Sequence, residues 1–357
     1  MRDKRRIGVG LAAALLAAVA LVPGEQGRAA AEGGTRVLFH DDFRSGFDTV
    51  GSWALLPTPG PNGTTLVAGD GVTSTSAGGL YVRPTGTNPS TGRPAFAAST
   101  GRQTAGGGGS DADHIKWLAY ENRVATTGLP GFDIPATGAL NCSATVSATA
   151  SGVDQQPFGD RVADPQSDPR LASASLIAAD FGSSAIADLA VTNTEVYAVY
   201  ERLRTPGSTW ASYSYVIPVA RRTPHRRNTL RIRYDQGGSR VTWFVDGRQV
   251  LSTDRIGYRA FDRRYMVLDH GGTEEPLAVR ETICGLGTGD ELDGAGADGR
   301  GLVELDSTPG YYYDPRLGEP APQSFADPAS LPGSRLWGQG ITLSVGSVDV
   351  RTTGTSG

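Results

Sequence analysis

The stretch that decides the fold is Leu230–Ser252, with the sequence LRIRYDQGGSRVTWFVDGRQVLS. Apolar side chains alternate with arginines as far as Tyr234, which is typical of a strand with one buried face. After a glycine-containing turn, residues 241–245 form a second run of strand-forming residues. Asp246-Gly247 is then typical of a two-residue turn that requires positive φ, and a third strand follows it. The stretch therefore predicts a meander of three antiparallel strands.

The rest of the chain continues this pattern of short β-branched or alternating runs, which glycine, proline, asparagine and aspartate separate. Residues 172–190 are ambiguous, because their pattern fits a helix or a pair of strands. The pattern as a whole predicts an all-β, antiparallel sandwich or barrel. The further expected strands cover residues 37–43, 79–83, 95–99, 144–150, 171–181, 187–203, 212–220, 265–268 and 341–351.

Three segments without a core-forming pattern interrupt the strands, near residues 102–113, 160–169 and 285–335. They are rich in glycine, or in aspartate and proline, and strands resume after each of them. We therefore expect residues 32–357 to form a single sandwich domain with long loop insertions.

Residues 1–31 have the organisation of a signal peptide. Basic residues precede an apolar run at Ile7–Val22, and Ala29-Ala30-Ala31 supplies small residues for cleavage. As a helix this run would span about 24 Å, which is short for a bilayer core of about 30 Å. We expect a secreted, extracellular protein that is not held at the membrane after cleavage. The 33 Lys and Arg residues against 37 Asp and Glu residues argue against general nucleic-acid binding, which needs a basic surface.

The two cysteines, Cys142 and Cys284, are an even pair in a chain expected to reach an oxidising compartment. Such a pair predicts a disulfide. Two buried free thiols are the alternative.

Several motifs together resemble a known superfamily. They are the opening Phe39-His-Asp-Asp-Phe43, Trp53, Asp70-Gly71, the hairpin at residues 241–250 and the closing strand at 345–351. In this order they resemble laminarinase-type jelly rolls of the concanavalin A-like lectin and glucanase superfamily. The chain also resembles a group of uncharacterised secreted actinobacterial proteins of unknown function. The resemblance implies two stacked antiparallel sheets, of which the concave one forms a groove for polysaccharide.

In laminarinase-like hydrolases, the catalytic strand carries a glutamate, an aspartate two residues on, and a second glutamate four or five residues after the first. Here alternation places Glu195, Tyr197, Val199 and Glu201 on one face of the corresponding strand. Tyr197 stands in place of the aspartate, and the Cα atoms of Glu195 and Glu201 would lie about 20 Å apart. Retaining hydrolysis needs carboxyl groups roughly 5–5.5 Å apart and inversion roughly 6.5–9.5 Å. Both glutamates are catalytic candidates, with polar residues on a solvated face as the alternative.

A glycan-binding groove does not need that acid pair, because sugar rings stack on aromatic side chains and polar groups fix their orientation. Core packing is the alternative role for each aromatic residue, and we assign Trp243 to the core. The candidate ligand-binding residues are Glu195, Tyr197, Glu201, Trp210, Tyr213 and Tyr215.

Two further segments carry candidate chemistry. His270 lies among acids and glycines in residues 269–275, and a histidine could serve a polysaccharide lyase. A polar turn is the alternative. In the acidic loop at 289–299, Asp290, Asp293 and Asp298 could bind Ca²⁺, with a solvated loop as the alternative. We expect no other cofactor.

The sequence thus predicts a secreted β-sandwich protein that binds an extracellular polysaccharide or glycan, and binding is favoured over catalysis. A diverged glycoside hydrolase or polysaccharide lyase is the first alternative, and a structural or interaction protein without a glycan site is the second. The oligomeric state is left open.

Overall fold

The structure is a computed structural model that describes residues 34–60, 64–98 and 114–354. The predicted signal peptide at 1–31 and the predicted loop at 102–113 lie outside the described residues. Strands dominate the described chain, and its helical segments are short 3-10 turns. None of the helices in these ranges is long and apolar enough to cross a membrane. The predicted fold class, an antiparallel two-sheet jelly-roll sandwich with long loops, is confirmed.

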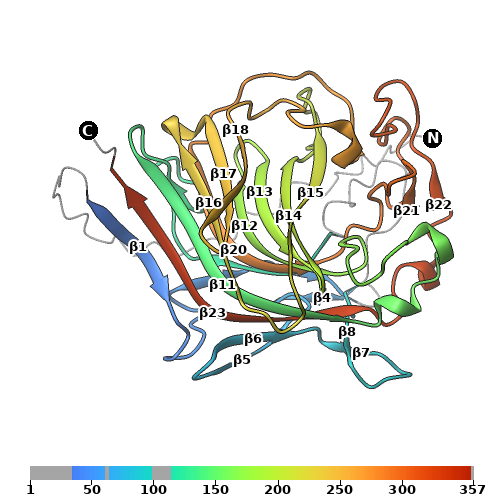
Figure 1. Ribbon diagram of the computed structural model, residues 1–357, viewed down its shortest axis with the longest axis horizontal. Coiled ribbons are helices and arrows are strands. Elements are labelled where there is room, and N and C mark those ends of the chain that lie inside the picture. The colour runs from blue at the N-terminus through green and yellow to red at the C-terminus, as the bar shows by residue number, and fades with distance from the viewer. Residues whose placement is uncertain (1–33, 61–63, 99–113, 355–357) are drawn as a thin grey trace, which may run out of the picture.

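Sheet A contains the two longest strands of the described residues, β11 and β23, side by side (Figure 1). They pair antiparallel from Ala139 opposite Thr353 to Ser151 opposite Gly340. In spatial order, the strands of sheet A are β18 (Arg248–Thr253), β17 (Arg240–Val245), β16 (Asn228–Asp235), β11 (Ala139–Ser151), β23 (Gly340–Thr353), β6 (Gly79–Arg83) and β5 (Val72–Ser76), with β1 (Thr35–Asp41) also on β23.

Sheet B packs on one face of sheet A and carries the strand with the predicted site residues, β14. Residues 172–190 are two of its strands, β12 and β13, and not a helix. In spatial order, the strands of sheet B are β19 (Met266–Asp269), β15 (Tyr213–Arg221), β14 (Glu195–Arg202), β13 (Ala185–Val191), β12 (Ser173–Asp180), β20 (Glu281–Gly289), β9 (Ile115–Glu121) and β2 (Trp53–Leu55), with β10 (Phe132–Asp133) also on β20.

The long insertion predicted at 285–335 contains more regular structure than expected. Its first residues complete β20, and two later pieces pair in parallel as β21 (Gly301–Val303) and β22 (Phe325–Asp327). Short pairs also form between β3 (Thr58–Pro59) and β4 (Thr65–Leu66), and between β7 (Gly86–Thr87) and β8 (Pro94–Ala95). The 3-10 turns are η2 (Val153–Gln155), η3 (Gly159–Arg161), η4 (Gln236–Gly238), η5 (Arg263–Tyr265) and η6 (Pro332–Ser334).

The meander at Leu230–Ser252 folds as predicted. β16, β17 and β18 pair antiparallel in sequence order. Asp246 and Gly247 have φ values of 50° and 80°, as the two-residue turn requires. Trp243 is fully buried in the core, which confirms its assignment.

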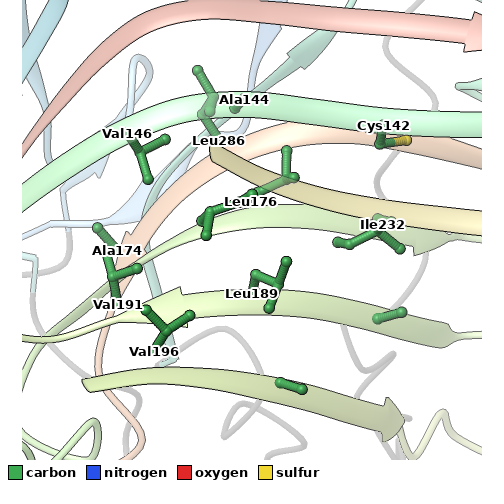
Figure 2. Close-up of a cluster of buried hydrophobic side chains, with 14 of the residues drawn as sticks. Cys142, Ala144, Val146, Ala174, Leu176, Leu189, Val191, Val196, Ile232 and Leu286 are labelled. Carbon is green, nitrogen blue, oxygen red and sulfur yellow. The ribbon is translucent and has the colours of Figure 1, made fainter. Parts of the chain in front are cut away.

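The core fills the space between the two sheets (Figure 2). Sheet A contributes Ala144, Val146 and Ile232, and sheet B contributes Leu176 and Leu189 from the facing side. Burying these side chains against one another removes apolar surface from water, which is the main stabilising contribution in such a sandwich. The inward side chains thereby determine which side chains of sheet B face outward.

The disulfide predicted for the two cysteines is confirmed. Cys142 lies on β11 and Cys284 on β20, so the bond joins sheet A to sheet B through the core. The Cα atoms of the two residues are 5.5 Å apart, which is the usual separation for a disulfide.

We predict that the double substitution Cys142→Ala/Cys284→Ala lowers the free energy of unfolding by roughly 2–5 kcal/mol. The disulfide closes a long loop in the unfolded chain, and without it the unfolded chain gains conformational entropy. Urea denaturation of the oxidised protein measures this difference. The unsubstituted protein in reductant is the control and should match the double variant. An unchanged unfolding midpoint would show that the bond does not stabilise the sandwich.

Candidate functional site

A pocket of ≈ 370 Å³ opens on the face of sheet B that points away from the core. Outward side chains of β13 and β14, such as Asp188 and Val199, line it, whereas their chain neighbours Leu189 and Ala198 belong to the core. We call this surface the pocket face. Its walls are mostly apolar and include Ile177, Ile186, Ala190, Val199, Leu203 and Val216.

Two glutamates in this pocket contact the hydroxyl group of the same serine. Glu201 on β14 is directly opposite Ser214 on β15, and the serine Oγ lies 2.6 Å from Glu201 Oε1 and 2.9 Å from Glu291 Oε1. A hydroxyl has a single proton to donate, so it can donate to one carboxylate only. The second contact then needs a protonated carboxyl group that donates to the serine oxygen. The geometry therefore favours one shared proton on this pair.

Glu291 reaches the pair from the loop that follows β20. Its backbone N–H donates to the carbonyl of Arg170 at 3.1 Å, and the next residue, Leu292, is fully buried in the core. Anchoring Leu292 on the inner side turns Glu291 toward the pocket.

Asp188 adds a third carboxyl group. It lies on the strand next to Glu201, two residues from Ile186, which is directly opposite Glu201. Its side chain is 9% exposed, and its Oδ1 accepts a 3.3 Å hydrogen bond from the backbone N–H of Ala178. Burial, and then the charge of Glu201, raise the pKa of Asp188 well above its usual range.

Burial also controls the protonation of the glutamate pair. It raises the pKa of Glu201, although the hydrogen bond from Ser214 acts in the opposite direction. Burial, and then repulsion from Glu201, raise the pKa of Glu291 to about 8. Near neutral pH Glu291 is thus mostly protonated and can donate a proton.

Further charged residues lie beside the trio, and His114 and Asp290 among them also line the pocket. His114 Nε2 is 2.7 Å from Asp293 Oδ1, and the Tyr312 hydroxyl donates to Asp293 Oδ2 at 2.8 Å. Burial opposes the charged form of Asp293, but these partners together lower its pKa. Asp290 lies 3.7 Å from Lys116 Nζ, and burial still raises its pKa to about 7.

The predicted face of β14 points outward, but only part of it lines the pocket. Val199 and Glu201 do so. Glu195 instead pairs with Arg221 at 3.0 Å, and the Tyr197 hydroxyl donates to the carbonyl of Ser167 at 2.7 Å. Glu195 and Glu201 are therefore not brought together as a catalytic pair.

The three other aromatic candidates are engaged elsewhere. The prediction that Tyr213 and Tyr215 bind ligand is wrong, because the pleat of β15 turns both into the core, where they are 1% and 0% exposed. Trp210 is half-buried, and the guanidinium of Arg202 lies 4.5 Å from the centre of its ring.

The candidate lyase and calcium residues also have protein partners. His270 is buried, with Nδ1 2.7 Å from the carbonyl oxygen of Tyr311, and burial lowers its pKa. Asp298 is exposed and accepts the backbone N–H of Arg300, away from Asp290 and Asp293. Across residues 34–60, 64–98 and 114–354, no group of three or more His, Cys, Asp or Glu side chains is arranged to hold a metal ion.

Sequence reasoning missed Asp188, Ser214, Glu291 and the aromatic residue Phe181. Phe181 lines the pocket, is 37% exposed, and contacts Tyr120 edge-on with ring centres 5.8 Å apart. One signal was available for Asp188, a single acid within the apolar run Ala185–Val191. Glu291 carried no comparable signal, because its loop is acidic throughout.

Comparison with known proteins shows the family of the chain. Residues 40–354 match the model of a family of unknown function (DUF6081). A relative from Acanthamoeba polyphaga mimivirus, "Uncharacterized protein L829", is 29% identical over the aligned part. That match covers 36% of this chain and 42% of the relative, so the chain spans less than half the relative's length.

The fold is also similar to solved structures at low sequence identity. The catalytic domain of an endo-1,3-beta-glucanase (laminarinase) from Thermotoga petrophila RKU-1 is 11% identical, with a TM-score of 0.40 over 90% of this chain and 99% of that chain. The Bacillus licheniformis beta-glucanase is 12% identical, with a TM-score of 0.39 over 90% of this chain and 99% of that chain. An alginate lyase from Pseudomonas aeruginosa is 12% identical, with a TM-score of 0.35 over 84% of this chain and 97% of that chain.

We predict that Glu291 makes stability depend on pH. Because its folded pKa of about 8 lies above the ordinary value of 4.5, its contribution is present below pH 4.5 and is lost as the pH rises through 8. Glu291→Gln should remove roughly 1–3 kcal/mol of the fall in unfolding free energy between pH 5 and pH 9. Denaturant titrations at several pH values measure this slope.

The matched control is Asp254→Asn, which changes an exposed carboxyl group beyond β18 and should leave the slope unchanged. An equal slope in Glu291→Gln and the unsubstituted protein would contradict the assignment.

Proposed function

The chain belongs to the DUF6081 family of unknown function, and we propose that it binds an extracellular carbohydrate in the pocket of sheet B. The observation that carries this proposal is the Glu201–Ser214–Glu291 group inside an otherwise apolar pocket. Binding sites for small molecules combine apolar walls with a few convergent polar groups that fix the orientation of the ligand. The predicted signal peptide supports an extracellular ligand.

The walls of the pocket suit the apolar faces of a sugar ring. Val199 and Val216 are outward residues of adjacent strands, and each is less than one-tenth exposed. The partly exposed ring of Phe181 offers a surface on which a sugar can stack, and Tyr120 holds it edge-on. The carboxyl groups of Glu201 and Glu291 would accept hydrogen bonds from sugar hydroxyls. The volume of ≈ 370 Å³ lies at the lower end of the usual range for ligand pockets and fits a short stretch of glycan.

If the pocket binds a glycan, two substitutions in it should each weaken the affinity for that glycan. Phe181→Ala should weaken binding of the best ligand in an oligosaccharide panel roughly three- to tenfold, because it removes the stacking surface. Glu201→Gln should weaken it roughly ten- to a hundredfold through loss of charged hydrogen bonds. Isothermal titration calorimetry measures both.

The control for Phe181→Ala is Tyr81→Ala, which removes an aromatic side chain that is 46% exposed on sheet A. Equal binding by Phe181→Ala and Tyr81→Ala would place the glycan elsewhere. No binding across neutral, acidic and basic oligosaccharides would favour the structural or interaction role.

A second candidate function, hydrolysis of a glycosidic bond, is favoured by the geometry of the glutamate pair. Both Oε1 atoms contact the same serine oxygen, at 2.6 Å and 2.9 Å, so their separation cannot exceed the sum of these distances. Retaining glycosidases place their carboxyl groups roughly 5–5.5 Å apart and keep one of them protonated. In this role Glu291, with its raised pKa, would protonate the leaving oxygen, and Glu201 would attack the anomeric carbon.

If the pair hydrolyses glycans, Glu201→Gln and Glu291→Gln should each lower the release of reducing ends at least a hundredfold, while Asp254→Asn retains the rate. A reducing-end assay on the bound oligosaccharides measures this. Binding without any release of reducing ends would restrict the protein to binding. Products with unsaturated ends would indicate a polysaccharide lyase.

A further inference from the structure

Within the described residues, none of the three carboxyl groups of the pocket forms an ion pair, although His114, which also lines the pocket, acts from a distance to lower the pKa of Glu201 and Glu291. Among the described residues, no Lys, Arg or His nitrogen lies within 4.0 Å of the carboxyl oxygens of Asp188, Glu201 or Glu291. The nearby cations are each held by another acid: Lys116 by Asp290, His114 by Asp293 and Arg170 by Asp168, the last at 2.6 Å.

The absence of a direct ion pair is costly where the carboxyl groups lie. Ile177, Val199 and Val216 surround them with apolar surface, and an ionised carboxylate in such a setting is strongly destabilised unless it is paired. A protein could satisfy these groups with its own arginine or lysine. In this pocket the space beside them is open instead.

Asp188 is an independent sign that a ligand completes the site. It is nine-tenths buried and lines the pocket, and its single hydrogen bond within the described residues is the long one from Ala178 to Oδ1. Within the described residues, no donor reaches its Oδ2. Asp290, 3% exposed at the same pocket, also has carboxylate oxygens without a hydrogen-bond partner. Buried polar atoms in folded proteins are nearly always hydrogen-bonded, so the oxygens of Asp290, with Lys116 Nζ 3.7 Å from Oδ2, indicate a missing donor.

We propose that the pocket binds a ligand through a primary ammonium group, and, on the basis of the proposed carbohydrate function, that this ligand is an amino sugar with a free amine. An ammonium group has one positive charge and three donors. Glu201, Glu291 and Asp188 offer it three carboxyl acceptors, two linked by Ser214 and the third at a diagonal position on the next strand. The carbon framework of the sugar would lie against the apolar walls.

The same chemistry predicts what the pocket rejects. N-acetylation removes the charge and leaves a single N–H donor, so the buried carboxyl groups would stay unpaired. A neutral sugar has hydroxyl donors but no charge to offset the burial of a carboxylate. A binding site discriminates strongly against ligands that leave its buried polar groups unpaired.

Calorimetry with three tetrasaccharides of equal length tests the proposal at 150 mM salt. The tetramer of glucosamine should bind at least tenfold more tightly than the tetramers of N-acetylglucosamine and of glucose. Asp188→Asn, a change of one atom, should remove most of this preference, and the exposed control Asp254→Asn should retain it. Glu201→Gln provides a second variant should Asp188→Asn fail to fold, as judged by circular dichroism.

A simple probe separates this inference from the carbohydrate proposal. n-Butylammonium chloride should raise the melting temperature of the protein, and Asp188→Asn should abolish the rise, whereas n-butanol should have no such effect. Equal or tighter binding of the glucose tetramer would overturn the ammonium inference and leave carbohydrate binding intact. A response to n-butylammonium without binding of any glycan would support the ammonium site and refute the carbohydrate. No response to either the amines or the glucosamine tetramer would refute the ammonium site.

Discussion

The alternation of side chains along each strand of sheet B is the constraint on which both the core and the pocket depend. On β14, Ala198 and Tyr200 pack against sheet A, so Val199 and Glu201 must face outward. On β13, Leu189 packs inward and Asp188 faces outward. A shift of one residue in either strand would place carboxyl groups in the core and expose the apolar side chains. The apolar contacts on one face therefore hold the acidic residues on the other.

The link between the sheets extends this control to the loop that supplies Glu291. Cys284 joins β20 to sheet A, and β20 ends shortly before that loop. Leu292 then anchors the loop in the core. The raised pKa values of Asp188, Glu201 and Glu291 show that the fold holds these acids where burial disfavours their charged forms. Perturbed pKa values of this kind are concentrated at sites that bind or transform a ligand.

Local patterns predicted the parts of the molecule that depend on neighbouring residues in the chain. The meander, the strands of the sandwich and the outward position of Glu201 all follow from alternation and turn chemistry. The same patterns did not show that Gly285 and Gly287 lie within a strand. Added Cβ atoms there would approach Ala119 O to 2.9 Å and Ile177 Cδ1 to 2.5 Å, so neighbouring strands, and not strand propensity, explain these glycines.

The sequence by itself determined the fold class, the meander and the cysteine pair, because these depend on hydrophobic period, turn residues and composition. The sequence also determined that Glu201 faces away from the core, but not which residues Glu201 contacts. Only the tertiary structure brought Glu291 to Ser214 and buried Tyr213 and Tyr215. A carboxyl pair from two distant segments depends on how strands pair and loops anchor, and the period of a single strand contains no information about its partner.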